Sequence, residues 1–142
     1  MKTVSLYKFK EEKIDQIIRS GFSEIGLNKK LKNAKTVFIK PNLVTDIKEY
    51  ILNGANTDLR IIRGVLEYLS NFDVEVYLGE SDTGTQIKGR KMEYALERMK
   101  VCELKKRYDF KAINLTKNQQ VITKIPNAKF LGSIKLSRIV LD

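Results

Sequence analysis

Two stretches of the sequence have the apolar pattern of β-strands and end in polar residues. Residues 37–39 form an unbroken apolar run, typical of a strand covered on both faces, and Lys40-Pro41-Asn42 follows directly. In residues 74–78, apolar and polar side chains alternate, which indicates a half-buried strand, and Gly79-Glu80-Ser81 comes next. Both strands are therefore predicted to end in groups that can contact a ligand.

A helix is predicted between these strands, over residues 58–71. Its apolar side chains recur at the spacing i, i+3, i+4 and i+7 of one helix face: Ile62, Val65, Leu66 and Leu69. A helical connection of this length joins parallel strands, so both carboxyl ends point the same way. Ligands bind at that edge in open α/β sheets, and we expect the polar residues there to be neighbours: Lys40, Asn42, Glu80 and Ser81.

The remaining pattern predicts further elements around this pair. Apolar side chains recur at helical spacing in residues 11–26 and 92–99, which predicts a helix in each range. Irregular segments are expected at residues 28–35 and 44–56. Further strands are predicted at residues 3–7, 112–115, 120–125 and 134–141. The predicted fold class is α/β, one domain over residues 1–142, with a mainly parallel central sheet and helices on both faces. A sheet that is incomplete at its C-terminal edge is an alternative that the sequence leaves open.

The composition limits the chemistry. Cys102 is the single cysteine of the chain, and histidine is absent. One thiol excludes an internal disulfide and argues against an iron–sulfur cluster or a structural zinc site. Without imidazole, acid–base chemistry must come from Lys, Glu, Asp or Tyr, or from a partner or cofactor that the sequence leaves unknown.

Neither a signal segment nor a membrane span is predicted. No apolar run approaches the ~20 residues that cross a bilayer, and Lys8 and Lys10 interrupt the N-terminus before a signal-type segment could develop. We therefore expect a cytoplasmic protein without a membrane partner.

The net charge of +10 raises the question of an anionic partner. The lysines are spread along the whole chain, without the aromatic interleaving or base-reading motifs of nucleic-acid modules. This pattern favours a solvated basic surface over a nucleic-acid footprint, and a small anionic ligand remains compatible with it.

Three polar motifs together resemble a known family. Lys40-Pro41-Asn42, Asn56-Thr57-Asp58 and Gly79-Glu80-Ser81 occur here in the order seen in domain of unknown function 362. The resemblance implies an α/β protein of unassigned activity, joined in some members to ferredoxin-like iron–sulfur modules. It also implies that the family domain continues after Asp142, so we expect this chain to be its N-terminal portion, with the other half missing or supplied by a partner chain. The multi-cysteine module is absent.

The predicted site follows from these motifs. We expect a ligand to contact Lys40, Asn42, Thr57, Glu80 and Ser81, with Thr83 and Thr85 as further phosphate contacts. Lys40 and Glu80 are the catalytic candidates, and Glu80 and Asp82 are weak candidates for a hard cation such as Mg²⁺. Each residue also has a structural interpretation: an ion pair for Lys40 and Glu80, and helix capping or turn formation for the others.

Three functions remain open at this point. The leading hypothesis is a domain that binds a small anionic molecule, as part of a larger enzyme of unknown reaction. A basic nucleic-acid-binding module and a non-catalytic assembly partner are the alternatives. Whether the chain itself catalyses a reaction stays undecided.

Overall fold

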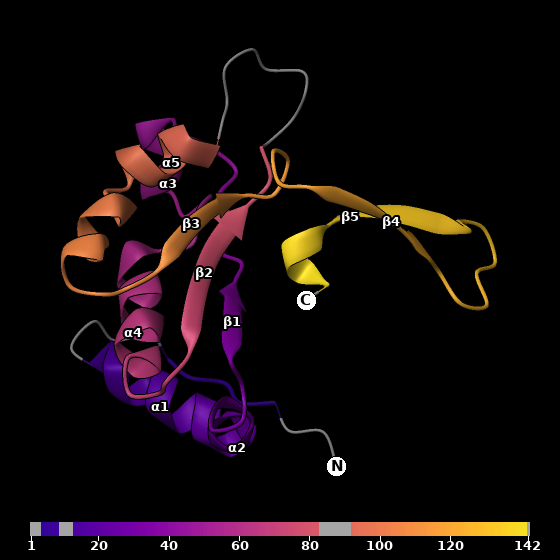
Figure 1. Ribbon diagram of the computed structural model, residues 1–142. Coiled ribbons are helices and arrows are strands. Elements are labelled where there is room, and N and C mark those ends of the chain that lie inside the picture. Colours follow the sequence, from indigo (N-terminus) through magenta and orange to yellow (C-terminus); the bar gives the residue numbers. More distant parts are fainter. Residues whose placement is uncertain (1–3, 9–12, 83–91, 142) are drawn as a thin grey trace.

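Three parallel strands form the central sheet of the protein (Figure 1). The computed structural model describes residues 4–8, 13–82 and 92–141. β1 (Thr36–Ile39), β2 (Glu75–Glu80) and β3 (Lys111–Asn114) lie in the order β1-β2-β3, with both pairings parallel. The α/β class and the mainly parallel sheet are therefore confirmed. The expected burial of the first two strands is reversed: β2 is the central strand and is largely buried, whereas β1 is a partly buried edge strand, because β3 pairs with β2 and not with β1.

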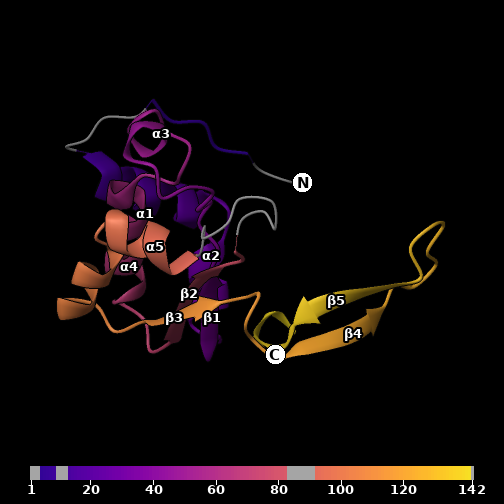
Figure 2. The same cartoon turned by 90° about the horizontal axis from the view of Figure 1, so that it is seen from above.

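Three helices cover one face of this sheet, whereas helices were expected on both faces. α1 (Ile14–Glu24), α4 (Leu59–Leu69) and α5 (Met92–Arg98) lie on the same side of the strands in both views (Figures 1 and 2). The apolar stripe predicted for the second of these helices is largely buried, and it packs with alternate strand residues into one core: Ile62, Leu66, Leu69, Val37, Ile39, Val76 and Leu78. Burial of this stripe fixes the crossover between β1 and β2, and with it their parallel direction.

Close contact between α1 and α4 depends on Gly64. A Cβ at this position would lie 2.5 Å from Cδ1 of Ile18 and 2.9 Å from Cγ2 of Ile14. Because real Cβ atoms do not approach this closely, the missing side chain lets the two helices pack directly against each other.

A separate hairpin follows the central sheet. β4 (Gln120–Lys124) and β5 (Ser133–Ser137) pair antiparallel, and the hairpin extends away from the helices in Figures 1 and 2. It exposes several apolar side chains, among them Phe130 and Leu131. The remaining elements are short: α2 (Leu27–Leu31), α3 (Lys48–Leu52), η2 (Val101–Lys106) and η3 (Arg138–Val140).

Several predicted boundaries are wrong. Residues 4–8 form no strand, because Val4 and Leu6 are exposed without a neighbouring strand, while Tyr7 donates a hydrogen bond to Glu24 at 2.5 Å. The expected last strand ends at Ser137 and continues as η3. The segments predicted as irregular contain the short helices α2 and α3, each of five residues, too short to show a clear period.

No helix in the described ranges is long and apolar enough to cross a membrane.

The contact between Tyr108 and Glu67 predicts a pH dependence of stability. The Tyr108 hydroxyl donates a hydrogen bond to the Glu67 carboxylate at 2.6 Å, and this bond holds the pKa of Glu67 below its ordinary value of 4.5. A depressed carboxylate pKa stabilises the fold above pH 4.5, and that contribution is lost as the pH falls through the folded-state pKa. Tyr108→Phe should therefore lower the free energy of unfolding at pH 7 by about 1 kcal/mol.

Urea denaturation between pH 7 and pH 3 measures this effect. The stability difference between the wild-type protein and Tyr108→Phe should shrink as the pH falls below 4.5. Tyr50→Phe, at an exposed tyrosine, is the matched control and should follow the wild type. A difference that stays constant across the whole pH range would show that the hydroxyl acts through packing alone.

Candidate functional site

The carboxyl ends of the three parallel strands form one rim. Ile39 of β1 is level with Leu78 of β2, and Glu80 of β2 is level with Asn114 of β3. The arrowheads of β1 and β2 point the same way in Figure 1. Lys40 follows β1 directly, so its side chain starts at the same edge as Glu80.

Lys40 and Glu80 form an ion pair at this rim, as the parallel arrangement predicts. The Lys40 side chain is 56% exposed, whereas that of Glu80 is 10% exposed. Lys40 Nζ donates to Glu80 Oε2, and the Ser81 backbone N–H donates to Oε1 at 2.7 Å. Both oxygens of the buried Glu80 carboxylate accept a hydrogen bond. The Lys40 ammonium group has three N–H donors and uses one of them in this ion pair. Glu80 therefore positions Lys40 at the rim.

Asn42 and Thr57 join the loop after β1 to the segment before α4. The Asn42 backbone N–H donates to Thr57 Oγ1 at 2.8 Å, and the Thr57 backbone N–H donates to the Asn42 carbonyl at 2.8 Å. The Asn42 side-chain amide donates to the Ala55 carbonyl, also at 2.8 Å. These contacts match the structural interpretation of both residues, which shape the loop beside Lys40.

Asn56 holds the same loop from inside. It is buried, and its side-chain oxygen accepts from the backbone N–H groups of Val44 and Thr45 at 2.9 and 3.1 Å. Its amide nitrogen donates to the Thr45 carbonyl at 2.7 Å. The motif Asn56-Thr57-Asp58 therefore fixes backbone geometry here.

The N-terminus of α4 already carries a carboxylate. Asp58 caps the helix by accepting from the Arg60 backbone N–H at 2.8 Å, and the Arg60 guanidinium pairs with it at 2.6 Å. Donation by the Arg60 side chain holds the pKa of Asp58 below its ordinary value, against the effect of burial. An anionic ligand at this helix end would meet Asp58, so the rim at Lys40 suits an anion better.

Residues that the sequence did not single out surround Asp82. Asp82 Oδ1 accepts from the Met92 backbone N–H at 2.9 Å and from the Asn114 amide at 2.7 Å. Asn114 also donates to Glu93, which pairs with Lys117 at 2.6 Å. Burial raises the pKa of Glu93, but donation by Lys117 and Asn114 outweighs it and leaves this pKa below its ordinary value. In the sequence, the position of Asn114 near the end of a predicted strand was the feature that could have indicated this cluster.

No group of three or more His, Cys, Asp or Glu residues that could hold a metal ion occurs within the described residues. Glu80 and Asp82, the weak metal candidates, each accept hydrogen bonds from the protein. The further phosphate contacts predicted at Thr83 and Thr85 lie outside the residues that the structure describes.

A hollow of about 430 Å³ opens beside Lys40, between the sheet and the base of the hairpin. Within the described part of the chain, its lining combines cationic, polar and apolar side chains without an acidic one: Phe38, Lys40, Ser81, Leu115, Gln120, Lys135, Leu136, Ser137 and Val140. Two of the five predicted ligand contacts, Lys40 and Ser81, are among them. The volume lies within the range of about 300–1,000 Å³ typical of small-molecule sites.

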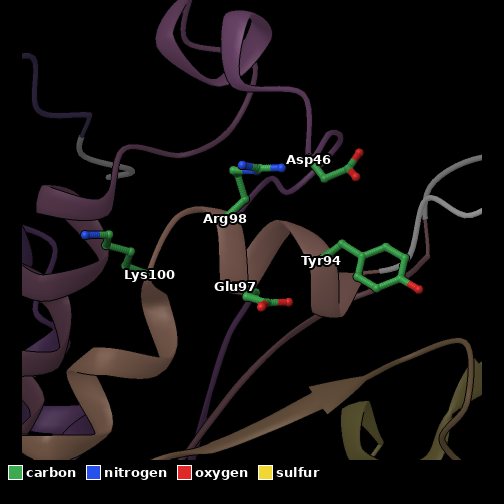
Figure 3. A pocket seen from close by; sticks show the side chains of 5 residues that line it. All are labelled: Asp46, Tyr94, Glu97, Arg98 and Lys100. Atoms are coloured by element: carbon green, nitrogen blue, oxygen red, sulfur yellow. The ribbon is translucent and has the colours of Figure 1, made fainter.

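A second hollow, of about 570 Å³, lies between the loop after β1 and α5. Figure 3 shows Arg98 extending toward Asp46, while Tyr94 and Lys100 point in opposite directions. Glu97 also lines this hollow. Charges of both signs on diverging side chains suit an anion less well than the hollow beside Lys40 does.

Comparison with known families gives a match over most of the chain. The family described as Domain of unknown function (DUF362) matches residues 37–142. The chain belongs to the DUF362 family. The resemblance seen in the three sequence motifs is thereby confirmed. The DUF362 match begins inside β1 and includes Lys40, Glu80 and the hairpin. No curated protein and no solved structure matches the chain.

Proposed function

We propose that this DUF362 protein binds a small organic anion at the carboxyl ends of its parallel strands, as part of a larger enzyme whose reaction is open. The observation that carries the proposal is the position of Lys40. This lysine is fixed by the buried Glu80 and lines a hollow to which, among the residues that the structure describes, no acidic side chain contributes.

Electrostatics favours an anion at this place. Lys40 and Lys135 both line the hollow, and each supplies a positive charge. Charges at the mouth of a partly apolar hollow act across a lower effective dielectric constant than in open water, so their attraction for an anion is stronger there. The ion pair with Glu80 offsets part of the charge of Lys40 but leaves two ammonium donors for a ligand.

The five predicted site residues then take two roles. Lys40 and Ser81 line the hollow and are the proposed direct contacts. Glu80 holds Lys40, while Asn42 and Thr57 fix the loop that follows β1. Glu80 and Lys40 are also the residues proposed for proton transfer to or from the ligand. The hydrogen bond between them would let a proton pass from one side chain to the other. A cytoplasmic location remains part of the proposal.

Thermal-shift measurements with inorganic phosphate, acetate and citrate test the proposal. A ligand that binds the folded state raises the melting temperature by mass action. At least one anion should stabilise the wild-type protein and lose that effect in Lys40→Met. Lys111→Met is the matched control, because Lys111 forms an exposed ion pair with Glu75 at the opposite end of β2. Equal shifts in the wild type and Lys40→Met would remove Lys40 from the site.

A further inference from the structure

We infer that the anion bound beside Lys40 carries an aromatic or similarly flat apolar group, held between the sheet and the base of the hairpin. This inference rests on the proposed function and narrows the ligand to aromatic phosphates or carboxylates. The hollow has a charged side and an apolar side, and both belong to the same volume of about 430 Å³.

The apolar side comes from separate parts of the chain. Phe38 of β1 and Leu115, directly after β3, belong to the sheet side, whereas Leu136 of β5 and Val140 of η3 belong to the hairpin side. Two apolar walls that face a common space can bury both faces of a ring, and this burial supplies affinity that a phosphate ion alone cannot gain.

Phe38 reaches this hollow because Gly79 leaves room for its ring. A Cβ on Gly79 would lie 3.2 Å from Cζ of Phe38. Phe38 alternates with Val37 and Ile39, which pack into the core on the helix-covered face, and is not part of that core itself. Its ring therefore belongs to the uncovered face of the sheet, where an aromatic ligand can stack or make edge contacts with it.

The hairpin supplies a second cation. Lys135 lines the hollow from β5, and no acidic residue occurs from Phe110 to Leu141 in the sequence. Within the described residues, Lys135 has no ion-pair partner. Lys40 and Lys135 can thus both attract one anionic group from different elements, while the ring of the ligand lies along the apolar walls.

Calorimetric titration with inorganic phosphate, phenyl phosphate and phenol tests this inference. Phenyl phosphate should bind the wild type at least about tenfold more tightly than inorganic phosphate, because the ring adds buried apolar area. Phenol alone should bind more weakly than phenyl phosphate. Lys135→Met should weaken both phosphates several-fold, whereas Lys124→Met, on the neighbouring strand and outside the hollow, should not.

A pair of hairpin variants tests the apolar wall. Val140→Asn changes a half-exposed lining residue and should bring the affinities for phenyl phosphate and inorganic phosphate close together. Leu131→Asn, at a similarly exposed position outside the hollow, should keep the wild-type ratio. Equal affinities in the wild type, or phenol binding as tightly as phenyl phosphate, would overturn the inference. Binding of inorganic phosphate that depends on Lys40 would uphold the proposed function even then, whereas failure of every anion would overturn both.

Discussion

Gly79→Ala should destabilise the protein by about 3 kcal/mol or more. A Cβ at this position would lie 2.2 Å from the carbonyl oxygen of Ile113, its partner in β3, and close to the ring of Phe38. The backbone of β2 or β3 would have to move, because a carbonyl oxygen in a strand cannot rotate away as a side chain can. The melting temperature should fall by on the order of 10 °C, measured by calorimetry.

Gly132→Ala provides the control for this substitution. A Cβ at Gly132, in the hairpin, meets no atom within 4 Å, and its φ is not positive. We expect this variant to unfold within about 0.5 kcal/mol of the wild type. If Gly79→Ala were as stable as Gly132→Ala, the close pairing of β2 with β3 beside the rim would be incorrect.

Lys40→Met should cost about 1–3 kcal/mol of unfolding free energy, a large effect for a lysine whose side chain is 56% exposed. The substitution keeps a long apolar stem and removes the ammonium group, so Glu80 loses its ionic partner while its side chain stays only 10% exposed. Urea denaturation at pH 7 measures the difference.

Two further variants isolate the pair. Lys111→Met breaks the ion pair between Lys111 and Glu75, whose side chains are 61% and 46% exposed, and should unfold close to the wild type because solvent screens an exposed pair. Glu80→Gln combined with Lys40→Met should be more stable than Lys40→Met alone, because no unpaired buried carboxylate remains. Equal costs for Lys40→Met and Lys111→Met would mean that Glu80 is as well solvated as a surface carboxylate.

The sequence predicted the centre of the fold well. The period of residues 58–71 follows from the burial of one helix face, which is regular for α4. The apolar run at residues 37–39 predicted a strand correctly but overestimated its burial, because β1 is a partly buried edge strand. Together, the two patterns predicted parallel strands and the meeting of Lys40 with Glu80, both of which the structure contains. The helices α2 and α3 were harder to predict, because five residues are too few to show a helical period.

The sequence could not separate binding groups from structural ones. Asn42, Thr57 and Asn56 are polar residues at a predicted ligand edge, and only their contacts show that they hold a loop. Nor could it predict that residues 120–137 would leave the sheet as a hairpin and bring Lys135 to the hollow beside Lys40. The position of this hairpin relative to the sheet depends on tertiary packing that local patterns do not encode.

The most direct test of the central claim is a ¹⁵N NMR titration of the wild-type protein with phenyl phosphate. We predict that the largest amide shift changes fall at Lys40, Ser81 and Lys135, because these residues line the hollow at the rim. The same titration of Lys40→Met should leave those signals nearly unmoved. Saturable shifts confined to the hollow lined by Asp46 and Arg98, or no saturable shift at all, would contradict a binding site at the ends of the parallel strands.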